Sequence, residues 1–371
     1  MSYEGLTVYV DSFFMMFYGG AMVTAILACI YLLFRRSNAF FPDVTPPLRL
    51  RRWVAAFFAV MALSHLWWYF LIKYNIFGDS WTNAVVGSCL DCITIPPCLL
   101  SVLVTMLQDR RRPLWSIALS IIPILVVFVV AIVQHSDIFV PLLRAYFLLL
   151  AFVFIIFMVR AVWQYGHWLR DNYADLEHKE VSQSYMVLAV CMMILIYYMS
   201  GISDKTSEYI VQGLNFMFVG HLLWRVETLQ TLDDSTKQAD HPEEAMALAS
   251  VAPSITIPSN IGKLLEQHCE ATHFYLQQDL TLSELSKAIG TNRYYLSQYF
   301  TQQNTTYNAY INDLRIQHFV KLYGESVASS SPSTAQQLAQ ESGFRSYSTF
   351  GTAFKQRMGQ TVREWMRDTA K

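Results

Sequence analysis

Charged residues are scarce in this chain of 371 residues. Asp, Glu, Lys and Arg make up 15 % of it, against roughly 25 % in an average soluble protein. The net charge of the chain is also close to zero, at −1, so charge alone indicates no class of binding partner. The shortage is uneven, because residues 1–226 hold 28 charged residues and the remaining 145 hold 27, a normal soluble density. The sequence therefore joins a lipid-compatible part to a water-compatible part.

Signatures of catalysis and of disulfide scaffolds are missing as well. Six cysteines, five of them in apolar segments, are too few for a disulfide framework. There is no glycine-rich phosphate loop, no H-E-x-x-H motif and no nucleophile elbow. A C-x-x-C pair, Cys89 and Cys92, has no second pair to complete a zinc site. We therefore expect no enzyme activity, no catalytic residues, no cofactor and no metal.

Long apolar runs dominate the first 226 residues. A bilayer core roughly 30 Å thick needs about 20 mostly apolar residues in a helix. Seven stretches reach that length, at 13–34, 53–77, 82–107, 114–134, 138–163, 184–203 and 206–226. The third and the seventh carry polar residues. The sequence predicts a transmembrane domain of seven helices over residues 1–226.

Basic residues in the short loops predict the orientation, because cytoplasmic loops retain Lys and Arg. The loops after the first, third and fifth runs, counted with Arg160 at the end of the fifth run, carry eleven of them, and the opposite side carries two. We therefore expect the N-terminus to lie outside the cell. With seven spans, everything after Val226 then lies in the cytoplasm.

Two of the charged residues inside the predicted spans could face each other. Asp91 lies about nine residues into the third run, roughly 13 Å from its outer end at 1.5 Å per residue. Arg144 enters the fifth run from the same side and could pair with it. A charge buried in a bundle indicates a functional site, or equally a structural ion pair or polar contact between helices. Asp91 and Arg144 are therefore candidate sensor residues.

The rest of the chain divides into a connector and a helical domain. Residues 227–259 are acidic and then rich in Ala, Ser and Pro, which predicts a flexible linker. Residues 260–371 show a helical pattern throughout, without alternating strand-like runs. Helices are predicted at 261–277, 282–289, 292–303, 306–323, 334–341, 346–358 and 361–369. The predicted fold class is all-α, a seven-helix transmembrane bundle followed by an all-helical domain.

Two segments of this domain, residues 282–300 and 335–354, share a short helix, a tight turn and a longer helix. Gly290 and Gly343 stand where the chain must turn sharply, with backbone angles that glycine adopts easily. The longer helices carry apolar anchors, Leu296, Phe300, Phe350 and Phe354. The other face of each longer helix is then left to enter a major groove of DNA. The pattern therefore predicts two helix-turn-helix units.

The domain resembles the DNA-binding domain of the AraC/XylS family of bacterial transcription regulators, over about 110 residues. The resemblance rests on residues at fixed spacings in both units and in the helix between them. They are Leu282, Leu285, Tyr295, Leu296, Phe300, Tyr310–Arg315, Leu338, Ala339, Gly343, Phe344, Tyr347–Phe350, Ala353–Lys355 and Gly359. Asn304, Phe319 and Val362 depart from the family pattern, and the Gly324–Ser333 connection is about five residues longer than in the family. These departures put the spacing between the two units in question.

The resemblance implies that exposed positions of each longer helix read bases. They are Tyr294, Ser297 and Gln298 in the first unit, and Tyr347, Ser348, Gly351 and Thr352 in the second. Gln can bond an adenine edge through two hydrogen bonds, whereas Tyr, Ser and Thr make single contacts. Candidates for phosphate contacts, which position a protein without reading sequence, are Arg293, Arg345, Lys355 and Arg357.

These features predict a sequence-specific regulator of transcription anchored in a bacterial inner membrane. It would bind double-stranded DNA in the major groove and sense an unidentified small-molecule or membrane signal. Residues 260–371 hold 11 basic and 9 acidic residues, so we expect tight binding to need two copies, as a homodimer. The alternative is a receptor or transporter whose helical tail docks a protein partner, although such a tail has no need of paired helix-turn-helix units.

Overall fold

The computed structural model describes residues 12–35, 45–136, 140–181, 184–185, 189, 205–232, 260–328 and 333–369. The regular structure of these residues is helical, and one isolated antiparallel bridge joins Tyr173 to Thr281. The chain divides into two compact units. The first contains Met1–Trp163 and Val181–Leu232, and the second contains Gln164–Glu180 and Asp233–Lys371.

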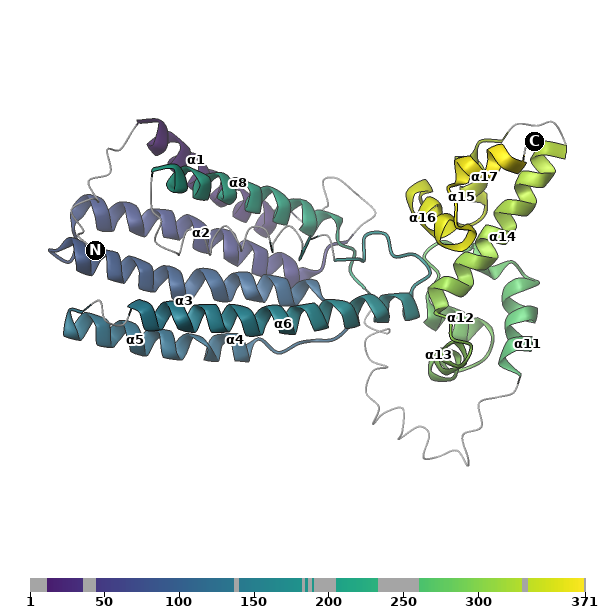
Figure 1. Ribbon diagram of the computed structural model, residues 1–371, viewed down its shortest axis with the longest axis horizontal. Coiled ribbons are helices and arrows are strands. Elements are labelled where there is room, and N and C mark those ends of the chain that lie inside the picture. Colours follow the sequence, from purple (N-terminus) through teal and green to yellow (C-terminus); the bar gives the residue numbers. More distant parts are fainter. Residues whose placement is uncertain are drawn as a thin grey trace, which may run out of the picture. The chain divides into compact units, whose positions relative to one another are not determined.

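Long helices form the first unit (Figure 1). They are α1 (Ser12–Phe34), α2 (Leu48–Tyr74), α3 (Ser80–Met106), α4 (Trp115–Leu119), α5 (Ile121–Gln134) and α8 (Lys205–Thr228). Helix α2 packs against α1, α3 and α8, and α3 packs against α4 and α5. A further helix, α6 (Val140–Asn172), begins in this unit, and its residues from Gln164 onward belong to the second.

The outer surface of these helices is apolar. On α5, the side chains of Ile122, Val126, Val129 and Val133 are between 53 % and 79 % exposed. Soluble proteins rarely expose large contiguous apolar patches, because apolar area in water costs roughly 25 cal/mol per Å². Helical stretches long and apolar enough to cross a membrane are Ser12–Phe34, Leu48–Tyr74, Ser80–Met106, Trp115–Gln134 and Pro141–Asn172. These five helices indicate a multi-pass membrane protein.

The described residues thus contain five candidate spans, not the seven predicted. The first five apolar runs coincide with them. The predicted span 206–226 does form a helix, α8, but Glu208, Gln212, Asn215 and Arg225 make it too polar to count as a candidate. The predicted span 184–203 lies almost wholly outside the described residues, and so does the predicted linker after Leu232.

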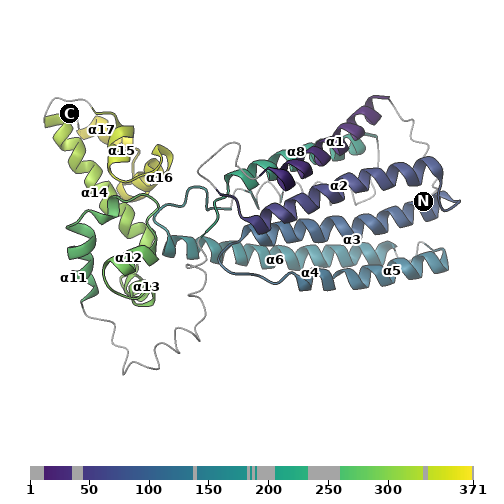
Figure 2. The same ribbon diagram turned by 180° about the vertical axis from the view of Figure 1, so that it is seen from behind.

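Shorter helices form the second unit (Figure 2). They are α11 (Ile261–Leu265), α12 (Leu282–Ala288), α13 (Arg293–Gln302), α14 (Tyr307–Ala328), α15 (Ala335–Glu341), α16 (Tyr347–Met358) and α17 (Val362–Thr369). A π-helical turn (Glu266–Glu270) and a 3-10 turn (Phe274–Leu276) follow α11, so the predicted helix 261–277 is three short pieces. The other predicted helices are present, and α14 runs on to Ala328.

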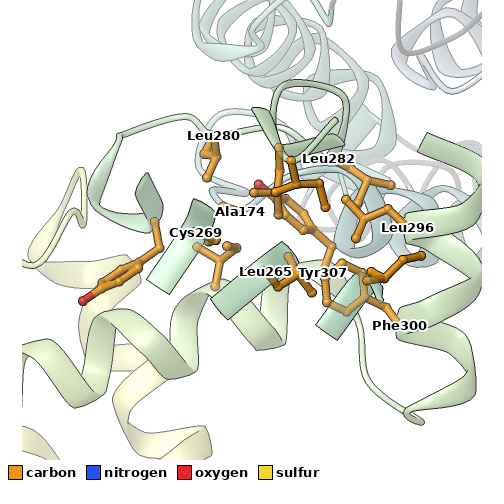
Figure 3. Packing of buried hydrophobic residues seen from close by; sticks show 13 residues of the cluster. Ala174, Leu265, Cys269, Leu280, Leu282, Leu296, Phe300 and Tyr307 are labelled. Atoms are coloured by element: carbon orange, nitrogen blue, oxygen red, sulfur yellow. The ribbon is translucent and has the colours of Figure 1, made fainter. Parts of the chain in front are cut away.

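Two hydrophobic clusters hold this unit together, and α14 contributes to both. The first cluster includes Leu265, Cys269, Leu285, Leu296, Phe300, Tyr307 and Ile311. The second includes Ile316, Phe319, Leu338, Phe344, Phe350, Phe354 and Val362. Figure 3 shows the first cluster with Ala174 inside it, a residue that comes two positions after the end of α6.

Candidate nucleic-acid interface

The first helix-turn-helix unit consists of α12 and α13. Thr281 and Glu284 form a capping box at the start of α12, in which each side chain accepts a hydrogen bond from the backbone amide of the other. Asn292 caps α13 by accepting a hydrogen bond from the amide of Tyr294 at 2.6 Å. Between the two helices, Gly290 has a φ of +70°, which only glycine adopts cheaply. These local signals fix where α13 begins.

The second helix-turn-helix unit consists of α15 and α16 and repeats the arrangement. Thr334 and Gln337 form a second capping box, and Ser346 caps α16 by accepting a hydrogen bond from the amide of Thr349 at 3.2 Å. Gly343 has a φ of +87°, and a Cβ atom there would lie 2.6 Å from the carbonyl oxygen of Leu276. Position 343 therefore requires glycine both for its backbone angle and for the close approach of the chain that precedes α12.

The second helix of each unit has a buried face and an accessible face. The predicted anchors Leu296, Phe300, Phe350 and Phe354 are at most 3 % exposed. The residues predicted to read bases lie on the accessible faces, where Tyr294, Tyr347, Ser348 and Thr352 are exposed and Ser297, Gln298 and Gly351 are half-buried. Polar hydrogen-bonding groups therefore gather on the accessible surfaces of α13 and α16. Their contact with bases stays a prediction.

The residues predicted to contact phosphates have protein partners in three of four cases. Arg293 donates two hydrogen bonds to Oδ1 of Asn172, from Nε at 3.1 Å and from Nη2 at 2.5 Å. Other ion pairs join Arg345 to Asp279, at 2.8 Å, and Arg357 to Asp313; Lys355 is exposed. Reasoning from the sequence missed Asn172 and Asp279, because no motif or spacing connects them to these arginines.

Arg315 of α14 joins the chain that precedes the first helix-turn-helix unit to the turn of the second. Its side chain is 1 % exposed, and it donates hydrogen bonds to the carbonyl oxygens of Tyr275 at 2.8 Å and of Gln277 at 2.7 Å. Its guanidinium lies over the ring of Phe344, 5.7 Å from the centroid. Burial lowers the pKa of Arg315, but an arginine starts so far above neutrality that it stays charged. The sequence offered one indication of this role, the position of Arg315 in the Tyr310–Arg315 run.

A family model described as a helix-turn-helix domain matches residues 285–368. The match begins in α12 and ends in α17, so it takes in both pairs of helices. Residues 285–368 are a helix-turn-helix domain of the AraC type. No curated protein and no solved structure matches the chain.

The AraC-type domain accounts for 84 of the 371 residues, and the match does not include the membrane helices. It implies DNA binding, and proteins that carry it are typically not enzymes. Among the described residues, no group of three or more His, Cys, Asp or Glu side chains could hold a metal ion.

The predicted sensor residue Asp91 lies at a contact between two membrane helices. Its carboxylate, on α3, accepts hydrogen bonds from Oγ of Ser64 and Nε1 of Trp68 on α2, both at 2.6 Å. These partners are neutral, as in a polar contact between helices. The side chain of Arg144 lies outside the described residues, so its pairing with Asp91 stays a prediction.

Proposed function

We propose that this protein is a membrane-anchored transcription regulator that binds specific DNA sequences through its AraC-type domain. The observation that carries the proposal is the paired geometry of α13 and α16. Each buries its apolar face, each leaves a polar face accessible, and α14 connects them. A protein built in this way can place two helices in successive major grooves of one duplex. Gln298 is the residue that we expect to discriminate between bases most directly, and Thr352 is the residue of α16 that we expect to make a single base contact.

The loops between the first five spans indicate on which side of the membrane the AraC-type domain lies. The loops after the first, third and fifth of them, counted together with the helix ends that border them, carry eleven Lys and Arg residues, as the cytoplasmic side does. The loop after the fifth span also supplies Ala174 to the first cluster of the second unit. This contact favours a position of the AraC-type domain on the Arg-rich side. This supports a bacterial inner-membrane protein with its N-terminus outside and its DNA-binding domain in the cytoplasm.

We expect the membrane helices to detect the signal and a second copy of the chain to strengthen DNA binding. Asp91, hydrogen-bonded between α2 and α3, is the candidate sensor for a small-molecule or membrane signal. Because residues 260–371 hold only two more basic than acidic residues, one domain neutralises few phosphates. We therefore expect tight binding by a homodimer.

Selection of binding sites tests the proposal. The full chain in lipid nanodiscs is incubated with a pool of random duplexes, and bound DNA is sequenced. We expect one enriched motif, and we expect Gln298→Ala and Thr352→Ala to relax its sequence at different positions. The control is Glu266→Gln, because Glu266 is exposed on the π-helical turn, outside both helix-turn-helix units. If no duplex binds at low salt, the proposal fails, and a receptor or transporter whose tail docks a protein partner becomes the better interpretation.

A further inference from the structure

The chain that follows α6 is built into the second unit. Tyr173 forms the antiparallel bridge with Thr281, and the amide of Ala174 donates to the carbonyl oxygen of Leu280 at 3.0 Å. Asn308 of α14 donates to the carbonyl oxygens of Tyr173, at 3.2 Å, and of Ala174, at 2.6 Å. The side chain of Ala174 is fully buried among the residues of the first cluster (Figure 3). Residues 172–180, called the docking segment below, are thus anchored by backbone and core contacts.

The docking segment also contacts the amino-terminal ends of α13 and α16, which are called the recognition helices below. Asn172 accepts both hydrogen bonds of Arg293, the first residue of α13. Glu177 accepts a hydrogen bond at 3.2 Å from the hydroxyl of Thr349, in the first turn of α16. One segment from the membrane half of the sequence therefore touches both helices that we expect to enter the major groove.

A third contact involves the second predicted phosphate-binding arginine. Lys179 of the docking segment is 3 % exposed and forms an ion pair with Asp279 at 3.2 Å. The other carboxylate oxygen of Asp279 pairs with Arg345 at 2.8 Å. The docking segment therefore contacts Arg293 directly and Arg345 through Asp279.

These contacts occupy positions that DNA phosphates favour. The amino-terminal end of a helix attracts anions through its amide groups and its dipole, and phosphate contacts position a recognition helix on the duplex. Glu177 places a carboxylate beside this end of α16, where it would repel a phosphate. Asn172 binds the guanidinium of Arg293 through its amide oxygen, which is a neutral acceptor. A phosphate makes the stronger, charge-assisted bond, so DNA can compete with the docking segment for Arg293.

We propose that the docking segment competes with DNA for the amino-terminal ends of α13 and α16, so that α6 controls the affinity of the AraC-type domain. This proposal rests on the proposed function. Asn172 is the last residue of α6, which is a candidate span over Pro141–Asn172. A change in this membrane helix reaches Arg293 without passing through the predicted flexible linker. Displacing the segment breaks the two hydrogen bonds between Arg293 and Asn172 and removes the carboxylate of Glu177 from α16.

The experiment measures DNA affinity against salt concentration, with the full chain in nanodiscs of neutral lipid and a long mixed-sequence duplex. Asn172→Ala should raise the affinity about fivefold and steepen the slope of log affinity against log salt by about 0.9, the value for one added phosphate contact. In an Arg293→Ala background, Asn172→Ala should change neither quantity. Asn172→Asp gives Arg293 a charged partner and should lower the affinity.

Glu177→Gln tests the second contact, because it removes the charge and keeps a hydrogen-bond acceptor. We expect a rise in affinity of about three- to fivefold. The matched control Glu266→Gln makes the same change of charge at an exposed residue outside the interface and should leave the affinity within about twofold.

The outcomes separate this proposal from the proposed function. Wild-type binding with unchanged affinity and slope in Asn172→Ala and Glu177→Gln would overturn the competition and leave the proposed function standing. Weaker binding in both variants would make the segment a structural support for the recognition helices, and would also overturn it. If the wild type does not bind DNA even at low salt, both proposals fail together.

Discussion

The guanidinium of Arg315 lies 5.7 Å from the ring centroid of Phe344, and the same side chain holds two carbonyl groups of the chain that precedes α12. One buried side chain therefore joins the linking helix α14 to the chain that precedes the first helix-turn-helix unit and to the turn of the second. Because two grooves can be read together only when α13 and α16 keep a fixed separation, Arg315 is well placed to set the spacing of the operator.

Replacing Arg315 by Met should destabilise the second unit by about 2–4 kcal/mol, because two buried carbonyl groups lose their charged donor. Arg315→Lys keeps the charge but not the planar fork, so we expect a smaller loss. Hydrogen–deuterium exchange of α12–α16 in the full chain gives the change in the free energy of local opening. The control is Arg363→Met, at an exposed position of α17. Equal exchange in Arg315→Met and the control would refute the linking role.

Gly343→Ala and Gly290→Ala form a matched pair, because both glycines have positive φ. Alanine at position 290 would meet no atom within 4 Å, so it should cost only the backbone strain, about 1–2 kcal/mol. Alanine at position 343 would also press against the backbone of Leu276 at 2.6 Å, and should cost about 1–3 kcal/mol more. Hydrogen exchange of α15 and α16 measures the difference. Similar losses at both positions would mean that the chain at Leu276 yields easily.

The helix-turn-helix units could be predicted from the sequence because their determinants are local. The turn at Gly290 and its apolar anchors lie within a stretch of about 20 residues, where spacing alone reports the geometry. The contact between Asn172 and Arg293 joins residues 121 positions apart. No periodicity, cap or motif encodes such a contact, and a short loop after a membrane span gives no indication that Ala174 is buried in another unit.

Among the described residues, the predicted span 206–226 is not a candidate membrane span, for a related reason. Residues 206–226 contain long enough apolar stretches to suggest a span, but the polar side chains between them make α8 too polar to be a candidate, and one of them contacts a neighbouring helix. Gln212 of α8 lies within hydrogen-bonding distance of Nε2 of His65 on α2, at 3.0 Å. A count of apolar residues cannot distinguish polar groups that face a neighbouring helix from those that face lipid.

Base reading and phosphate contact should be separable by mutation once a binding motif has been selected. Gln298→Ala should cost about 1–3 kcal/mol at one position of the motif and relax the preference there. Lys355→Ala should weaken binding to all sequences alike and reduce the salt slope by about 0.9. Fluorescence anisotropy with the motif and with single-base variants distinguishes the two effects. If Lys355→Ala relaxes the sequence preference, the assignment of Lys355 to phosphate is wrong.

The stability of the second unit should fall as the pH is lowered through the range of His318. Burial on α14, assisted by His273 and Lys321, lowers the pKa of His318 from its ordinary value of 6.5. The unfolded chain therefore binds this proton more tightly than the folded unit, so stability is complete above about pH 6.5 and is lost below it. Pulse proteolysis in urea, at several pH values, measures the loss. His318→Gln should reduce this pH dependence, and an unchanged dependence would exclude His318 as its source.

Asp91→Asn tests whether the polar contact between α2 and α3 is part of the sensor. The substitution removes the charge but retains an acceptor for Ser64 and Trp68, which both lie at 2.6 Å, so the helices should remain packed. Asp79→Asn is the matched control, because Asp79 caps α3 through the amide of Thr82 and Asn caps helices equally well. We expect transcripts near the selected binding sites to change in Asp91→Asn cells and not in Asp79→Asn cells. An unchanged transcriptome in both would leave Asp91 as a structural contact and move the search for the sensor to another part of the bundle.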